Sequence, residues 1–333
     1  MSSISVVIPT YNKLSDLEST LSGFTQQTNK NFEIVVADDG STDNTQKMIR
    51  SFSHQMNIVY SYDESKGRAS ARNRGLQLAS GDLIVFVDSD RIPSSSFLEE
   101  HCNALRAKEK IVSIGSKYSI LRKYTSKLRI PFNAQAEFLR FIERNPGVTQ
   151  KLLNEEALFT SEVLRQNLDA AIKTFYLFEP PDNFNSIREV FSDRFSDFSF
   201  AWIAATTGNM ALRRNDINDL SFDESMIGWG AEDTDFAYQL YLRGYEFHFT
   251  PEASNYHQEH PRAPGEFEQL INNIKRMCAK YPDAIEILLW RKVTEYKDNF
   301  TFLEADKMLK DFEKLPNGVL RESILSLLKE KYC

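Results

Sequence analysis

Two carboxylates separated by a single residue, Asp88 and Asp90, follow the apolar run at positions 83–87. In an extended backbone, side chains at positions i and i+2 point to the same side. Two like charges held so close repel each other unless a cation lies beside them, and carboxylate oxygens suit Mg²⁺ or Mn²⁺. The triplet that they form with Ser89 therefore indicates a divalent-cation site. An ordinary acidic turn is the alternative that the triplet alone leaves open.

A second carboxylate pair, Asp38 and Asp39, follows the apolar run at positions 33–37. The residues at positions 41–43 are Ser, Thr and Asp, which commonly cap a helix. Capping alone is the alternative explanation for these three residues. Two carboxylates ahead of the cap are more than a helix start requires, so this pair favours ligand binding.

Aromatic and basic side chains accompany these acids. Residues 9–12 end the first apolar run, and Tyr11 offers the aromatic face that a nucleotide base requires as a platform. Between positions 67 and 75, Arg68 and Arg72 are four residues apart and share one face of a helix. Guanidinium groups suit phosphate, so these arginines favour a phosphate-bearing ligand. An ordinary turn and a solvated helix face are the respective alternatives.

The elements that must position these residues alternate between strand and helix. Near-continuous apolar strands separated by helices indicate a parallel sheet covered on both faces, and ligands of such sheets bind at the carboxyl ends of the strands. Three of the strands end in the polar groups described above. The sequence predicts strands at 5–8, 33–37, 58–62 and 83–87, and helices at 14–26, 44–53 and 69–78.

The second half of the chain is more helical. The strand pattern lapses over about 118–200, where a long helical run at 151–176 and an aromatic stretch at 178–200 indicate an insertion. Strand-like sequence resumes at 202–213 and 246–251 around a helix at 233–243, which Gly244 terminates. The core fold is expected to close near His260. Helices are predicted at 267–281, 284–296 and 303–331.

Four motifs in this order resemble the nucleotide-binding half of family-2 glycosyltransferases with the GT-A fold, namely residues 5–12, 36–43, 67–75 and 86–90. The resemblance implies an α/β nucleotide-diphospho-sugar transferase fold, with a mostly parallel central sheet flanked by helices, a helical insertion and a helical C-terminal extension. It also implies that Tyr11 stacks on uracil, that Asp39 bonds the base, and that Asp90 holds Mn²⁺ or Mg²⁺ on the diphosphate. The residues it implies in support of nucleotide or sugar binding are Pro9, Arg68, Arg72, Asp88 and Ser89.

Two motifs in the second half resemble the acceptor side of the same enzymes. They are the sequence Thr-Gly-Asn-Met at 207–210 and Trp-Gly-Ala-Glu-Asp-Thr-Asp-Phe at 229–236, which is similar to galactosyltransferases and chondroitin polymerases. By that analogy Asp233, or alternatively Glu232, is the general base. An inverting transfer needs one carboxylate to take the acceptor proton while the diphosphate leaves opposite. Favourable charge at a helix N-terminus is the alternative explanation of both acids, which the preceding Trp-Gly turn makes less favoured.

Similar enzymes often take a third metal ligand from the position that His257 occupies, after the strand predicted at 246–251. An imidazole beside carboxylates suits Mn²⁺. His260 competes for this role, and an exposed loop histidine is the alternative. We expect the other histidines, at positions 54, 101 and 248, to be structural.

Composition limits the classes of protein that fit. The 333 residues carry 40 Lys and Arg against 47 Asp and Glu, a net charge of −7, which leaves no global basic footprint for nucleic acid. Three dispersed cysteines argue against a disulfide framework and fit a reducing compartment. No signal sequence or spanning segment is recognised, so a cytoplasmic protein is expected. A basic cluster at positions 122, 123, 127 and 129 suggests either peripheral contact with the inner membrane face or a phosphate-bearing acceptor, with a solvated helix face as the alternative.

These observations lead to one principal functional hypothesis: a hexosyl- or N-acetylhexosaminyltransferase (EC 2.4) that uses a UDP-sugar. The acceptor is a glycan, lipid-linked saccharide, peptide or small molecule, and the unmatched helical segments would shape its site or an oligomer contact. The expected organisation is a nucleotide-sugar-binding half (1–117), a helical insertion on the acceptor side (118–200), an acceptor and catalytic half (201–261) and a helical extension (262–333).

Two other functions are weighed against this hypothesis. A sugar-nucleotide nucleotidyltransferase would carry a glycine-rich, lysine-bearing loop after the first strand, and residues 9–12 are not such a loop. A non-catalytic nucleotide-sugar-binding subunit would lack the metal or base carboxylates, yet Asp88, Asp90 and Asp233 are all present.

Overall fold

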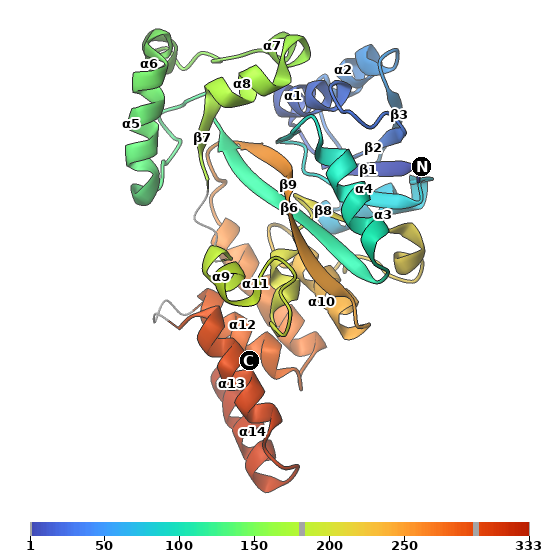
Figure 1. Ribbon diagram of the computed structural model, residues 1–333, viewed down its shortest axis with the longest axis vertical. Helices are drawn as coiled ribbons and strands as arrows, with labels where there is room; N and C mark the ends of the chain where they lie inside the picture. Colours follow the sequence, from blue (N-terminus) through green and yellow to red (C-terminus); the bar gives the residue numbers. More distant parts are fainter. Residues whose placement is uncertain (1, 180–183, 296–299, 333) are drawn as a thin grey trace.

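The computed structural model describes residues 2–179, 184–295 and 300–332 (Figure 1). The strands described form one sheet in the order β3-β2-β1-β4-β8-β6-β9-β5, with β7 paired to β6. They are β1 (Ile4–Thr10), β2 (Phe32–Asp38), β3 (Asn57–Tyr62), β4 (Leu83–Phe86), β5 (Arg91–Pro93), β6 (Ile111–Ile120), β7 (Tyr176–Phe178), β8 (Met210–Arg213) and β9 (Glu246–Gln258).

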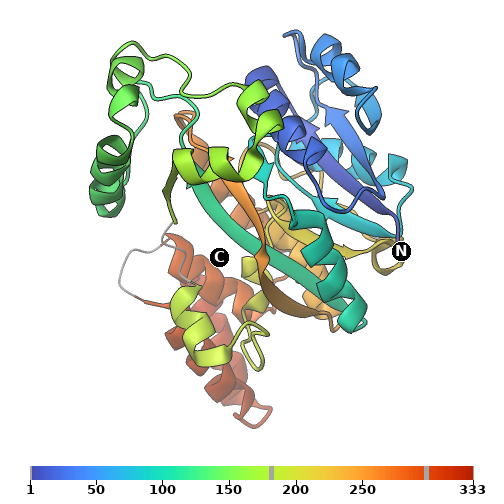
Figure 2. The same ribbon diagram turned by 45° about the horizontal axis from the view of Figure 1, so that its top comes forward.

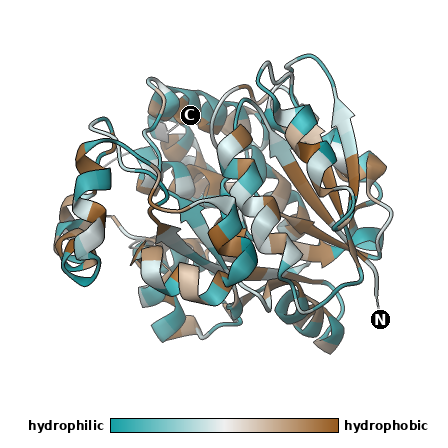
Figure 3. Ribbon diagram, turned by 90° about the horizontal axis from the view of Figure 1, so that it is seen from above, coloured by the Kyte–Doolittle hydropathy of each residue, from teal (hydrophilic) through white to brown (hydrophobic). Residues whose placement is uncertain are grey.

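The first four strands form the parallel part of the sheet. Alternate residues of each strand face opposite sides: Val7 and Val35 join one hydrophobic cluster, whereas Val6 and Val36 join another. Figure 3 shows hydrophobic residues concentrated along these strands. The helices that follow the strands are α1 (Leu14–Thr25), α2 (Thr45–Phe52), α3 (Arg68–Leu78) and α4 (Phe97–Ala107). The predicted α/β architecture is confirmed, and each element predicted in this half has its counterpart.

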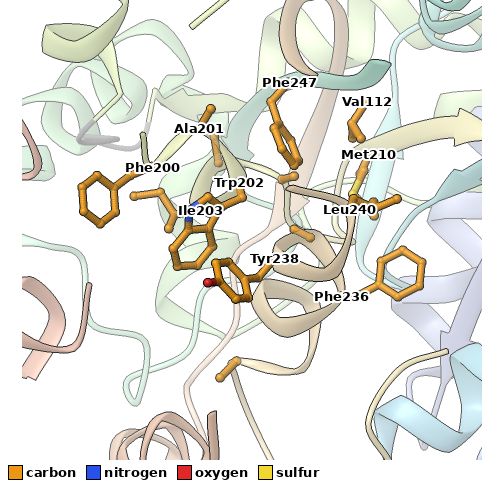
Figure 4. Close-up of a cluster of buried hydrophobic side chains, with 14 of the residues drawn as sticks. Val112, Phe200, Ala201, Trp202, Ile203, Met210, Phe236, Tyr238, Leu240 and Phe247 are labelled. Atoms are coloured by element: carbon orange, nitrogen blue, oxygen red, sulfur yellow. The ribbon is translucent and has the colours of Figure 1, made fainter. Parts of the chain in front are cut away.

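The other part of the sheet is mixed. Strand β8 runs antiparallel to both β4 and β6, whereas β6 and β9 pair in parallel over most of their length. The prediction of a strand at 202–213 was partly wrong, because only Met210–Arg213 is strand and Ala201–Ala204 forms a 3₁₀ helix. This segment is apolar because it is buried: Trp202 packs edge-on against Tyr238 at 5.0 Å between ring centroids (Figure 4).

The predicted lapse of strand structure over about 118–200 was partly wrong, because β6 continues through Ile120 and β7 pairs with its end. The long helix predicted at 151–176 is interrupted, and Asn167 caps a new helix by accepting a hydrogen bond from the Ala170 N–H. The helices are α5 (Gln135–Arg144), α6 (Thr149–Leu153), α7 (Ser161–Gln166), α8 (Leu168–Phe175) and α9 (Asn185–Phe191). Helix α5 packs against β7 at one end of the sheet, while α7 packs against α1 and α8 follows it (Figure 2).

Helix α10 (Glu232–Leu242) precedes β9, and four helices follow that strand: α11 (Glu266–Lys280), α12 (Ile285–Glu295), α13 (Phe302–Glu313) and α14 (Val319–Tyr332). The single helix predicted at 303–331 is two helices, because Pro316 and Gly318, the latter at φ 146°, interrupt it. The C-terminal helices pack on the same core as the sheet, with Trp290 5.8 Å from Trp202 between ring centroids. Within the described ranges, none of the helices has both the length and the apolar character that crossing a bilayer requires.

Candidate active site

Two adjoining cavities open where the parallel strands end. The first, of about 420 Å³, brings together every residue predicted on the nucleotide side, namely Pro9, Tyr11, Asp39, Arg68, Arg72, Asp88, Ser89 and Asp90. The second, of about 540 Å³, is lined by both base candidates and both histidines, namely Glu232, Asp233, His257 and His260. The two cavities share a wall made of Arg68, Arg72, Asp88, Asp90, Trp229, His260 and Glu266. Residues that are far apart in the sequence therefore meet at one place.

Tyr11 and Asp39 lie at the ends of neighbouring strands, since Thr10 of β1 is in register with Asp38 of β2. Tyr11 is 52% exposed, so its ring is available to a ligand. Asp39 is buried, and its carboxylate accepts hydrogen bonds from the Ser65 hydroxyl at 3.0 Å and from two backbone N–H groups of residues 66 and 67 at 2.9 and 3.0 Å. These donors fix the carboxylate at the cavity wall.

The two acids of the Asp-Ser-Asp triplet diverge. Strand β4 ends at Phe86, so the triplet lies in a turn and the expectation that both side chains lie on one side of an extended strand was wrong. Asp88 accepts a hydrogen bond from Arg72 at 3.1 Å and lies 3.6 Å from Arg91 Nε. A Cβ at Gly208 would lie 2.9 Å from Asp88 Oδ2, so the Thr-Gly-Asn motif leaves room for this carboxylate.

Asp90 turns instead toward two histidines. Its Oδ2 lies 3.1 Å from His260 Nε2, and its Oδ1 lies 3.9 Å from His257 Nε2. One oxygen and two ring nitrogens of these residues lie within 4.8 Å of one another, which is a donor set able to hold a metal ion. Burial opposes ionisation, but His257, the hydrogen bond from His260 and nearby Lys13 hold the pKa of Asp90 well below its ordinary value.

His257 is positioned by a strand. The prediction placed it in a loop after 246–251, but β9 continues to Gln258, and His257 is in register with Arg91 of β5. Its Nδ1 lies 3.1 Å from Glu259 Oε1, a contact that orients the ring. The resemblance favoured His257 over His260 as the metal ligand, and in the structure both rings lie within 4 Å of the Asp90 carboxylate.

The two base candidates have different surroundings. Glu232 is buried and forms an ion pair with Arg72 at 2.7 Å. Asp233 lines the second cavity and accepts a hydrogen bond from the Thr234 N–H at 2.8 Å. Burial, together with the negative charge of Glu232, raises the pKa of Asp233 to about 6. Asp233 is therefore ionised at neutral pH and can accept a proton, whereas the Glu232 carboxylate is already paired with a guanidinium.

Sequence reasoning did not identify four cationic residues of these cavities, namely Lys13, Arg91, Lys117 and Arg262. Lys13 lies 3.7 Å from Asp90, and Arg91 and Lys117 line the second cavity. Lys13 and Arg91 each lie beside a motif, which is the signal that could have found them.

Of the predicted basic cluster, Arg122 forms an ion pair with Asp16 at 2.7 Å. Among the other histidines, His101 is buried between Ser113 and Asn209, and its burial lowers its pKa to about 4.

The chain is similar in sequence to known glycosyltransferases. Residues 5–160 match the family model described as glycosyl transferase family 2. The chain is 26% identical to the uncharacterized glycosyltransferase YfnE of Bacillus subtilis, over 98% of this chain and 82% of that protein. It is 30% identical to validoxylamine A glucosyltransferase of Streptomyces hygroscopicus (86% and 63%) and 28% identical to chondroitin synthase of Pasteurella multocida (80% and 26%). The chain thus spans less than two thirds of the length of these last two relatives.

Two solved structures share the fold. Residues 1–349 of TarS from S. aureus align with a TM-score of 0.54 at 18% identity, over 89% of this chain and 72% of that one. The mannosyltransferase PcManGT from Pyrobaculum calidifontis aligns with a TM-score of 0.54 at 18% identity, over 98% and 79%. The predicted fold class is therefore confirmed. The sheet, the motifs and the relatives together identify the chain as a glycosyltransferase, whose residues 5–160 match glycosyl transferase family 2.

Proposed function

We propose that the chain transfers a sugar from a UDP-sugar to an acceptor hydroxyl with inversion at the anomeric carbon. The first cavity would bind the donor, and the second would bind the acceptor. The observation that carries this proposal is the shared wall, because Asp90 lies on it between a cavity with Tyr11 and Asp39 and a cavity with Asp233. A donor and an acceptor bound on the two sides of that wall would meet beside it.

The uracil base is assigned to Tyr11 and Asp39. The exposed Tyr11 ring offers a stacking face. Asp39 Oδ1 accepts one hydrogen bond, from Lys66 N, and a carboxylate oxygen has about two acceptor positions. One position therefore remains for the imide N–H of uracil. Cytosine has no N–H at the equivalent ring position, so this contact would favour uracil.

The diphosphate is assigned to a divalent cation and to the basic side chains of the wall. Asp90, His257 and His260 fit Mn²⁺, because one carboxylate and two imidazoles form a mixed oxygen and nitrogen donor set. The cation would neutralise the charge of the diphosphate. Arg68 is exposed on the shared wall and can reach a phosphate directly. Among the proteins that share the fold, the structure of TarS has been solved in complex with UDP-GlcNAc, and that of PcManGT in complex with GDP-Man and Mn²⁺.

The proton transfer is assigned to Asp233. In an inverting transfer the acceptor oxygen bonds to the anomeric carbon as the bond to the diphosphate oxygen breaks on the opposite side, and the acceptor proton passes to a carboxylate. A base with a pKa of about 6 is ionised at neutral pH and remains basic enough to take that proton. Glu232 would act indirectly, through its charge and its ion pair with Arg72.

The acceptor class is proposed from the second cavity. Its walls combine aromatic rings at Tyr118, Phe184 and Phe249 with the cationic groups of Lys117 and Arg262. Such a lining suits a glycan, a lipid-linked saccharide, a peptide or a small polyhydroxylated molecule. The relatives named validoxylamine A glucosyltransferase and chondroitin synthase carry the names of quite different products, so the cavity and not the family must identify the acceptor.

A donor screen tests the proposal. The melting temperature would be measured with UDP-, GDP-, CMP- and dTDP-sugars, each with and without Mn²⁺. A ligand of the native state at 100 times its Kd stabilises it by about 2.7 kcal/mol, a shift that is readily measured. We expect the largest shift with a UDP-sugar and Mn²⁺ together. A larger shift with a GDP-sugar, or the same UDP-sugar shift without metal, would contradict the donor or the cation assignment respectively.

A further inference from the structure

The turn that leads into the Asp233 helix has an unusual backbone. Gly228, Gly230 and Ala231 have φ values of 88°, 90° and 72°, all in the left-handed region. Ala231 directly precedes α10, and its side chain makes this conformation costly. A backbone of this kind keeps its shape only where the surrounding structure determines it. The contacts around residues 227–231 therefore decide where Trp229 and Asp233 lie.

Helix α11 supplies hydrogen bonds to this turn. Asn273 has no solvent exposure, and its side-chain amide donates to Gly230 O at 2.9 Å and to Ile227 O at 3.2 Å. One turn earlier on the same face, Gln269 Oε1 accepts from the Trp229 N–H at 2.8 Å. Two side chains of one helix thus bind three backbone groups within four consecutive residues.

Further contacts from α11 and one from α3 confine the turn and the start of α10. A Cβ at Gly228 would lie 2.5 Å from Gln269 Oε1, so the glycine allows the helix to approach this closely. Farther along α11, Lys280 pairs with the fully buried Asp235 at 2.8 Å. From the opposite side, Arg72 of α3 holds Glu232. The start of α10 is therefore held between α3 on one side and α11 on the other.

We propose that Asn273 and Gln269 are positioning residues for the transfer reaction, because they hold the turn that places Trp229 and Asp233 at the two cavities. The inference rests on the proposed role of Asp233 as base. Helix α11 lies outside residues 5–160, which match the family model. A displacement of about 1 Å at a reacting group can lower a rate about 100-fold, so a small relaxation of this turn affects catalysis.

Asn273→Asp is the principal test. The aspartate keeps the shape of the side chain and an acceptor for Arg276, which donates to Asn273 Oδ1 at 3.0 Å. It removes both N–H donors and places an oxygen against two carbonyl groups. Asn272→Asp is the matched control, because it makes the same change at the exposed neighbouring residue. We expect Asn273→Asp to lower kcat by about 10- to 100-fold while the Kd for UDP changes less than about threefold. Asn272→Asp should leave both unchanged.

Gln269→Met is a second variant that spares the fold, because Gln269 is an exposed side chain. It removes the acceptor for Trp229 N, and because Gln269 also lines the first cavity, the Kd for UDP is measured together with kcat. We expect a smaller loss of kcat, with a change in the Kd for UDP of less than about threefold. Combined with Asn273→Asp, its effect should be less than multiplicative, because both residues act on one turn. Normal kcat in both single variants would overturn the inference. A parallel loss of kcat, UDP affinity and melting temperature in Asn273→Asp would also overturn it, since the amide would then serve stability alone.

Asp233→Asn, measured alongside, separates this inference from the proposed function. An inactive Asp233→Asn beside fully active Asn273→Asp and Gln269→Met would overturn the positioning role and leave the base in place. A fully active Asp233→Asn would overturn the base itself, and the positioning role with it.

Discussion

The pH dependence of transfer should report the ionisation of Asp233. The pKa of about 6 that burial and Glu232 give this carboxylate lies above its ordinary value, and only the ionised form can accept the acceptor proton. Activity should therefore be present above pH 6 and be lost as the pH falls through 6. At pH 5 only about a tenth of the carboxylate is ionised, so kcat/KM should be about tenfold lower at pH 5 than at pH 7.

Glu232→Gln should move the acid limb of the pH profile, the range in which activity falls as the pH falls, to lower pH. The substitution removes the like charge next to Asp233, so the pKa of Asp233 falls. A decrease of about one unit corresponds to about 1.4 kcal/mol and would place the limb near pH 5. The residual activity of Glu232→Gln at pH 5, relative to its own plateau, should then exceed that of the unchanged protein by about fivefold.

The histidines are a competing source of an acid limb, because protonation of His257 or His260 would expel a bound cation. The assay is therefore a kcat/KM profile from pH 4.5 to 8 at two Mn²⁺ concentrations that differ by about tenfold. A limb that arises from the histidines shifts with Mn²⁺ concentration and ignores Glu232→Gln. A limb that arises from Asp233 stays in place when the Mn²⁺ concentration changes and shifts in Glu232→Gln. A limb that shifts with Mn²⁺ concentration and not with Glu232→Gln would refute the assignment to Asp233.

Three further substitutions test separate parts of the site. Asp90→Asn should abolish the metal dependence of UDP affinity while the protein remains folded, and calorimetry that finds an unchanged affinity with Mn²⁺ would remove the metal assignment. Asp39→Ala should weaken UDP binding by roughly 1–3 kcal/mol, and equal affinity of the unchanged protein for UDP and CDP would contradict the assigned base contact. Arg72→Met leaves Glu232 buried without its cation and Asp88 without one donor, and should lower the free energy of unfolding in urea by about 3–5 kcal/mol. A loss below about 1 kcal/mol would mean that water reaches this pair.

The parallel half of the fold and the gathering of the donor residues could be predicted from the sequence. Apolar runs and turn residues alternate with the regular periods of strand and helix there, and the carboxyl ends of neighbouring parallel strands must meet. The apolar run at Trp202 was misassigned to a strand because short buried segments lack a periodicity that separates strand from helix.

Pairings between distant segments could not be predicted. Both histidines reach Asp90 because β9 continues past residue 251 and pairs with β5, which no local pattern reveals. Asn273 belongs to an amphipathic helix in which a single buried asparagine resembles any other polar residue. Its role depends on which turn lies opposite, and that is a property of the tertiary structure.

The place of β8 between β4 and β6 has a consequence for synthesis of the chain. Phe86 of β4 pairs with Met210 of β8, so the partner of β4 leaves the ribosome long after β4 itself. At about 5–20 residues per second this delay is on the order of 10 s, during which an apolar strand edge stays open. An open edge is a template for pairing with other chains. Until β8 is synthesised and covers it, this edge of the nascent first half is therefore open to pairing with other chains.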